Sequence, residues 1–204
     1  MMWFVSQRCQ IPEPFAIAVS GVAGSGKSTL GRAIARSLRA PLIDLDSVTN
    51  PLLEELPAAA LGGHWLSSPY GPAIREGRYA ALRATARDAL AAAGRAVLVA
   101  PFTAELTGGP EWQVLCQAVA PAELTMIRLI GDPELLASRR ARRGESRDRY
   151  RSPDPDAAPP PAVPVITIDA GLTIDQQLAG LWPRLGCQWP FDLSNPMFGS
   201  PRRP

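Results

Sequence analysis

The chain has 204 residues, long enough for one domain with a substantial core, and 46% of them are hydrophobic, which excludes a largely disordered protein. Its 21 basic and 19 acidic residues give a net charge of +2, so total charge gives no reason to expect nucleic acid or an anionic membrane as a partner. No apolar run approaches the roughly 20 residues that span a bilayer. The three cysteines are far apart, which favours reduced thiols and a cytoplasmic location.

Short apolar segments alternate with segments of helical periodicity along the chain. Strands are predicted over 15–20, 41–46, 96–100, 124–130 and 165–169. Helices are predicted over 29–39, 51–56, 72–93, 110–120, 133–143 and 173–185. Residues 57–71, and 152–164 with six prolines, are predicted loops. This alternation is typical of parallel βαβ units and predicts a three-layer α/β domain.

The turn after the first predicted strand carries the most specific motif. Residues 21–28 read Gly-Val-Ala-Gly-Ser-Gly-Lys-Ser, which matches the P-loop pattern Gly-x-x-x-x-Gly-Lys-Ser/Thr. Its glycines let the backbone curl around phosphates, and the start of the next helix adds partial positive charge. We expect Lys27 to reach the β- and γ-phosphates and Ser28 to bind Mg²⁺. The predicted nucleotide-binding residues are Gly21, Gly24, Ser25, Gly26, Lys27, Ser28 and Thr29.

Lys27 is the only lysine among the 21 basic residues, the other 20 being arginine. In a chain with so strong a preference for arginine, a retained lysine indicates a position where the planar arginine fork cannot serve.

Two carboxylates, Asp44 and Asp46, lie at the end of the second predicted strand. The third predicted strand runs into Pro101 with no carboxylate, so the metal and base roles are assigned to this pair. Ligands of open parallel sheets bind at the carboxyl ends of strands, where residues two apart on a strand share one side. We expect one carboxylate to hold Mg²⁺ through water and the other to accept a hydroxyl proton. The alternative is an Asx-type turn and helix cap around 47–50.

Seven arginines gather between positions 139 and 151. Every fourth residue from 139 to 151 is an arginine, and these four would share one helical face if the helix continued past Gly144. Their repulsion there favours a bound anion such as a triphosphate. The four are Arg139, Arg143, Arg147 and Arg151. Arginines closing over that anion would stabilise charge in the transition state. The alternatives are a solvated charged surface and a contact with nucleic-acid phosphates.

The P-loop, the strand end Leu42-Ile-Asp-Leu-Asp46 and the Arg-rich segment together resemble the small bacterial P-loop kinases and AAA-type ATP-binding proteins. That group includes the gluconate, shikimate and chloramphenicol phosphotransferases and the nucleoside-monophosphate kinases, and the resemblance covers about residues 15–185. It implies a three-layer P-loop NTPase fold with a five-stranded parallel sheet flanked by helices and an Arg-rich lid. It also implies ATP as donor, Mg²⁺ as cofactor and a small hydroxylated acceptor.

The resemblance also assigns roles. By position, Asp46 resembles the carboxylate that activates the acceptor hydroxyl, and Asp44 the one near Mg²⁺. Arg139 and Arg143 resemble lid arginines that pack on adenine and contact phosphates. Together with Lys27, these residues form the predicted catalytic set. The expected organisation is an extension over 1–14, a kinase domain over 15–186 with its lid at about 139–163, and a Pro-rich tail over 187–204.

The predicted function is an ATP-dependent phosphotransferase acting on a hydroxyl of a small metabolite, with an antibiotic or its precursor among the acceptors considered. Besides Asp46, we expect His64, Arg75, Arg78 and Tyr79 to bind the acceptor. The spacing of Arg75 and Arg78 would suit an anionic one. The alternatives are a polynucleotide 5′-hydroxyl kinase and a nucleotide-binding regulator without catalysis. We expect no nucleic-acid or membrane partner, and either a monomer or a homodimer.

Overall fold

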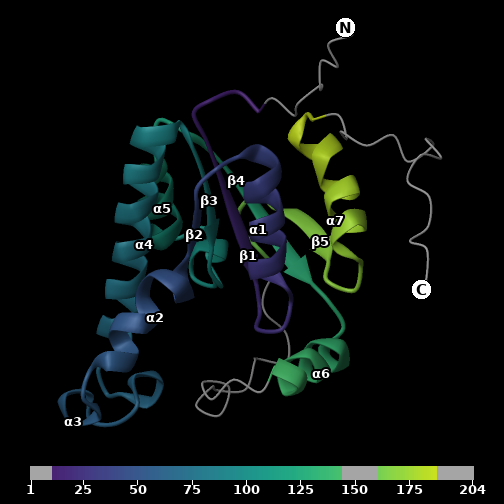
Figure 1. The fold of residues 1–204 in the computed structure, drawn as a ribbon. Helices are drawn as coiled ribbons and strands as arrows, with labels where there is room; N and C mark the ends of the chain where they lie inside the picture. Colours follow the sequence, from purple (N-terminus) through teal and green to yellow (C-terminus); the bar gives the residue numbers. More distant parts are fainter. Residues whose placement is uncertain (1–10, 144–159, 188–204) are drawn as a thin grey trace, which may run out of the picture.

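The computed structural model describes residues 11–143 and 160–187 (Figure 1). Five strands form one sheet in the order β2-β3-β1-β4-β5, and every neighbouring pair is parallel. The strands are β1 (Phe15–Gly21), β2 (Leu42–Asp44), β3 (Arg95–Val99), β4 (Glu123–Ile130) and β5 (Ile166–Asp169). This sheet confirms the predicted α/β class with five parallel strands.

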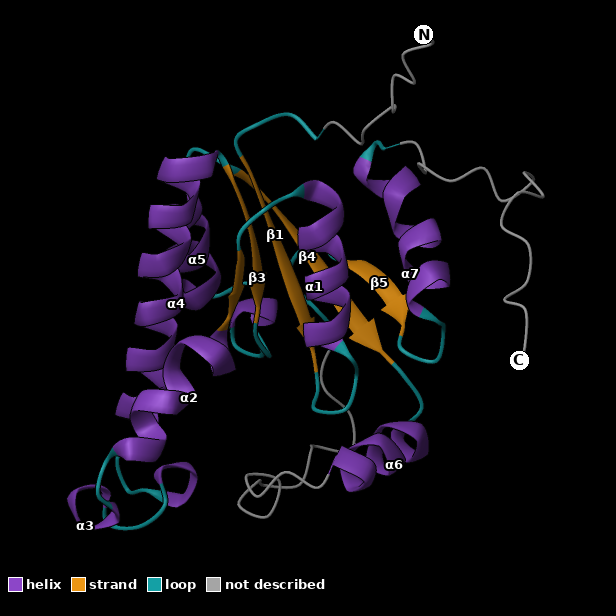
Figure 2. Cartoon of the chain, viewed as in Figure 1, coloured by secondary structure: helices purple, strands orange, loops and turns teal. Residues whose placement is uncertain are grey.

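Helices cover both faces of the sheet, with α4 and α5 on one side and α1 and α7 on the other (Figure 2). The helices are α1 (Lys27–Leu38), α2 (Leu45–Glu55), α3 (Ala58–Leu61), α4 (Gly71–Ala93), α5 (Pro110–Val119), α6 (Pro133–Arg143) and α7 (Ile174–Leu181). Short 3-10 turns occupy Trp65–Ser67, Glu105–Thr107 and Trp182–Leu185. Among the described residues, none of the helices is both long and apolar enough to cross a membrane.

The central strand β1 is buried along its whole length and supplies both halves of the core. Ile17 and Val19 face the layer of α1 and α7, whereas Ala16 and Ala18 face the layer of α4 and α5. This division follows from the alternation of side chains along a strand. The carboxyl end of β1 leads directly into the P-loop, so the core fixes where that turn lies.

The structure differs from the sequence predictions around the second strand. β2 ends at Asp44 and α2 begins at Leu45, because the Asp44 carboxylate accepts the backbone N–H of Asp46 and caps the helix. The helix predicted from Pro51 therefore begins six residues earlier and holds that proline in its interior. The predicted loop 57–71 contains α3 and a 3-10 turn.

The prediction of reduced thiols does not hold for Cys187, which is buried and disulfide-bonded. Cys116 carries a free thiol, as predicted. The predicted lid is described only at its two ends, and Arg147 falls outside the described part.

Candidate active site

The turn between β1 and α1 has the conformation that the P-loop motif predicts. Gly24 and Gly26 have φ angles of 82° and 87°, in the left-handed region that favours glycine. A Cβ atom at Gly24 would lie 2.6 Å from the carbonyl oxygen of Leu136 in α6, so the turn also has no space for a side chain there. Helix α1 begins at Lys27, directly after Gly26.

The turn fits a phosphate group by several local criteria. Gly26 offers no side chain to cap α1, and the first turn of this helix contains no acidic residue. The partial positive charge of the helix start is therefore not neutralised by the helix itself. Ser25 is 1% exposed, and its Oγ has no hydrogen-bond partner within the described part of the chain. A polar atom in this position is suited to an oxygen-rich ligand.

A pocket of about 290 Å³ adjoins the start of α1 and brings the predicted metal and base residues together. Ser28 comes from α1, Asp44 from the end of β2, and Asp46 from the first turn of α2. Asp46 thus reaches this pocket from a helix and not from the predicted strand end. The lining residues are Ser28, Arg32, Asp44, Asp46, Ser47, Asn50, Pro51 and Glu54.

The two carboxylates have different surroundings. Asp44 is 8% exposed, and its Oδ1 accepts the backbone N–H of Asp46 at 3.0 Å. The side chain of Asp46 is 38% exposed and pairs with Arg78, whose Nη2 lies 2.7 Å from its Oδ1. A hydroxyl and a carboxylate are oxygen ligands of the kind that Mg²⁺ uses beside substrate phosphates and water, so Ser28 and Asp44 fit that ion.

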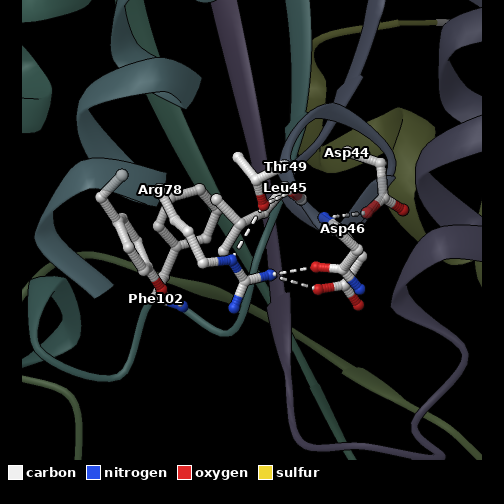
Figure 3. Close-up of polar contacts among 8 residues, drawn as sticks. Asp44, Leu45, Asp46, Thr49, Arg78 and Phe102 are labelled. Atoms are coloured by element: carbon white, nitrogen blue, oxygen red, sulfur yellow. Dashed lines mark hydrogen bonds and ion pairs between the residues drawn. The ribbon is translucent and has the colours of Figure 1, made fainter. Parts of the chain in front are cut away.

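Arg78, predicted to bind the acceptor, faces α2 (Figure 3). Its Nη2 also donates to Asn50 Oδ1 at 2.9 Å, and its Nε donates to Thr49 Oγ1 at 2.8 Å. The guanidinium carbon lies 4.9 Å from the centre of the Trp65 ring. The structure therefore joins Arg78 to one of the predicted catalytic residues, which the spacing on α4 alone did not indicate.

A second arginine of α4, Arg75, lies beside an acid that the sequence predictions did not include. Glu105 is 2% exposed, and its Oε2 lies 3.7 Å from Arg75 Nη2. Removal from water raises the pKa of Glu105 above its usual range. The guanidinium of Arg75 also lies 4.5 Å from the Tyr79 ring. The only sequence signal was that Glu105 is the first carboxylate after the third strand.

Tyr79 and His64 form contacts within the protein. Tyr79 is 4% exposed, its hydroxyl accepts the backbone N–H of Phe102, and burial raises its pKa above the usual range. The Nδ1 of His64 accepts the backbone N–H of Leu66 at 3.3 Å, and its ring stacks on Trp65. The acceptor-binding roles of both residues stay predictions.

The arginines of α6 lie next to the P-loop. Arg140 Nη1 donates to the carbonyl of Ala23, within the P-loop, at 3.1 Å. Arg139 Nη1 donates to the carbonyl of Ala170, after β5, at 2.8 Å. Arg140 was therefore missed by the four-residue spacing that selected Arg139 and Arg143. The side chain of Arg143 lies outside the described residues, and its phosphate role stays a prediction.

No curated protein matches the chain. Among solved structures, a candidate kinase from Chloroflexus aurantiacus J-10-fl is 22% identical, with a TM-score of 0.63 over 87% of this chain and 97% of that one. A gluconokinase from Sinorhizobium meliloti 1021 is 21% identical, with a TM-score of 0.55 over 85% and 92%. A shikimate kinase from Aquifex aeolicus VF5 is 16% identical, with a TM-score of 0.50 over 84% and 96%. These likenesses establish the P-loop kinase fold.

The match to a family model agrees with the position of the P-loop and the sheet. The model, described as an AAA domain, covers residues 17–157, which is more than half of the chain. The chain therefore belongs to the AAA_33 family of AAA domains.

Proposed function

We propose that the protein is an ATP-dependent phosphotransferase that transfers the γ-phosphate to a hydroxyl of a small metabolite. The observation that carries this proposal is the pocket that joins Ser28 of the P-loop helix to Asp44 and Asp46. The fold shared with a gluconokinase and a shikimate kinase supports it. An antibiotic or its precursor belongs to the acceptors to be tested.

In the proposed reaction, the residues of the P-loop hold the donor and Asp46 acts on the acceptor. The backbone of 21–28 and Lys27 would bind the β- and γ-phosphates, and Ser28 and Asp44 would hold Mg²⁺, which supplies positive charge that neutralises the phosphates when bound. The acceptor oxygen forms a bond to the γ-phosphorus while the bond from that phosphorus to the β-phosphate oxygen breaks. The hydroxyl proton passes to the carboxylate of Asp46, leaving ADP and a phosphate ester.

The contribution of the arginines follows from where they lie. We assign Arg139 and Arg143 to the donor phosphates, as the resemblance implies, and Arg147 because of its spacing from them. We add Arg140 because it contacts the P-loop carbonyl of Ala23. A cation at this position would stabilise the charge that develops on the transferring phosphoryl group. The side chain of Arg75 is 40% exposed, and we keep it among the residues proposed to bind the acceptor.

A nucleotide-binding regulator without an acceptor is the second candidate. It is favoured by the third strand, which ends at Val99 and is followed by no carboxylate until Glu105. A regulator of this kind would bind Mg-ATP and change shape without transferring phosphate.

The kinase should turn over ATP when a suitable alcohol is added, whereas the regulator should bind ATP without turnover. The test is ADP formation from Mg-ATP with a panel of sugar acids, polyols, shikimate, chloramphenicol, nucleoside monophosphates and an oligonucleotide with a free 5′-hydroxyl. Phosphorus NMR identifies any phosphate ester that forms. Turnover with a small alcohol supports the kinase. ATP binding without turnover on the whole panel favours the regulator.

Asp46→Asn tests the assigned base. We expect turnover to fall by roughly 100- to 10,000-fold, while the dissociation constant for Mg-ATP changes little. Asp88→Asn, at an exposed position of α4, is the control and should leave both unchanged. An unchanged rate in Asp46→Asn would move the base role to Asp44 or elsewhere.

A further inference from the structure

We propose that Arg78 is a positioning residue that holds the carboxylate of Asp46 toward the pocket, and that it is not an anion site for the acceptor. This inference rests on the proposed function in one respect, namely that Asp46 is the base. It replaces the acceptor-binding role that the sequence predicts for Arg78.

The guanidinium of Arg78 binds one face of α2 over a single turn. Its three hydrogen-bond acceptors are Asp46 Oδ1, Thr49 Oγ1 and Asn50 Oδ1, at 2.7, 2.8 and 2.9 Å. Positions 46, 49 and 50 differ by three and four residues, so they share a side of the helix. A planar fork can donate to several acceptors at fixed angles, whereas the single ammonium group of lysine cannot reproduce that arrangement. The contacts therefore select arginine.

Two of the residues that accept hydrogen bonds from Arg78 are themselves held by further hydrogen bonds. Thr49 Oγ1 donates to the carbonyl of Leu45 at 2.6 Å, which leaves its lone pairs for the Nε–H of Arg78. The backbone N–H of Asp46 donates to Asp44 Oδ1 at 3.0 Å. The main chain of Asp46 is thus bound to the predicted metal ligand and its side chain to Arg78. These two contacts help to set where its carboxylate lies (Figure 3).

The position of Arg78 is also constrained by residues outside α2. Trp65 is 5% exposed, and its ring lies 4.9 Å from the guanidinium carbon, a distance typical of a cation–π contact. The next residue, Tyr79, binds the main chain after β3 through its hydroxyl. Only 15% of the Arg78 side chain is exposed. Nη2 is engaged by Asp46 and Asn50, and Nε by Thr49, so an anionic acceptor could bind these two nitrogens only by displacing those residues.

The kinetic test uses Arg78→Met and Arg78→Lys, with the acceptor found in the panel. Because a small misplacement of a catalytic group costs about 100-fold in rate, we expect kcat to fall about 100-fold in Arg78→Met. The KM values for ATP and acceptor should stay within about threefold, because the variant keeps the contacts that bind both substrates in the ground state. Lysine should not rescue kcat. A raised KM for the acceptor with kcat preserved, or full rescue by lysine, would overturn the proposal.

Arg83→Met is a matched control. Arg83 also lies on α4, pairs with a carboxylate at 2.6 Å and is 14% exposed, but its partner is Glu76. Loss of this pair should leave kcat unchanged. An equal loss of kcat in Arg83→Met would mean that disturbing α4, and not releasing Asp46, lowers the rate.

A second measurement requires no acceptor. Crystal structures of the wild type and Arg78→Met should show the Asp46 carboxylate displaced by at least about 1 Å in the variant. The bond between Asp44 and the backbone of Asp46 should persist. If Arg78→Met does not fold, the same comparison is made with Arg78→Lys. An Asp46 carboxylate that keeps its place overturns the positioning role, whereas a wild type inactive on every alcohol overturns only the proposed function.

Discussion

The hydroxyl of Tyr79 accepts a hydrogen bond from the backbone N–H of Phe102 over 3.1 Å, and this bond joins α4 to the loop after β3. Phe102 is fully buried and has a φ angle of 49°, a left-handed conformation that costs a residue with a Cβ atom about 1–3 kcal/mol. The two rings pack edge to face, with centroids 6.0 Å apart. Because Arg75 and Arg78 lie on the same helix, this bond helps to set the position of both arginines.

Tyr79→Phe removes the acceptor of that bond and keeps the ring. The buried N–H of Phe102 loses its partner, so we expect the free energy of unfolding to fall by about 1–3 kcal/mol. Tyr70→Phe is the control, because Tyr70 is 57% exposed and should change stability by less than about 0.5 kcal/mol. Urea unfolding measures both. Equal stabilities of the two variants would show that the hydroxyl of Tyr79 contributes nothing to the fold.

Lys27→Ala removes the ammonium group from the P-loop. We expect phosphoryl transfer to fall below detection, by at least about 100- to 1,000-fold, because a cation that stabilises transferring charge is lost. The fold should persist, since α1 is held by its buried face. Circular dichroism checks the fold, and Arg36→Ala, exposed in the last turn of α1, is the activity control. Near-normal transfer in Lys27→Ala would contradict the assignment of the P-loop.

Two glycine substitutions should have opposite effects on stability. In Gly24→Ala the new Cβ would meet Leu136 O at 2.6 Å on a left-handed backbone, so we expect a loss of about 1–3 kcal/mol together with weaker Mg-ATP binding. In Gly77→Ala the Cβ meets no atom within 4 Å inside a helix, so we expect a gain of about 0.5–1 kcal/mol. Urea unfolding and titration calorimetry measure these effects. A Gly24→Ala protein as stable as the wild type would contradict the tight packing of α6 on the P-loop.

The buried acid Glu105 should make stability depend on pH. Its pKa is raised in the folded state, mainly by removal from water, so the folded protein retains a proton that the unfolded chain has released. Its contribution is therefore fully present below the ordinary carboxyl pKa and is lost as pH rises through the raised value. Relative to Glu105→Gln, the wild type should lose stability as pH rises above about 4, the ordinary pKa of a glutamate carboxyl group. Urea unfolding of both proteins at pH values below and above that point is the measurement. A difference that grew in favour of the wild type as pH rises would mean that pairing with Arg75 outweighs burial.

The fold class, the P-loop and most helix boundaries could be predicted from the sequence because they depend on neighbours within a few residues. Gly94 ends α4 in a left-handed conformation, and Asp132 and Thr173 accept backbone N–H groups at the starts of α6 and α7. The glycine spacing of the P-loop likewise acts through its own backbone. The start of α2 was missed, although the cap at Asp44 is local, because the apolar pattern around it also suits a strand.

The partners of the long polar side chains were decided by the tertiary structure alone. Arg78 pairs with Asp46 across 32 positions, and Arg140 contacts Ala23 across 117. Such pairs exist only because the sheet order places β2 beside β3 and because α4 and α6 pack where they do. An arginine can reach many acceptors, and its sequence neighbours do not restrict the choice. The sequence by itself therefore determined the P-loop turn, whereas only the folded chain decided which arginine pairs with the proposed base.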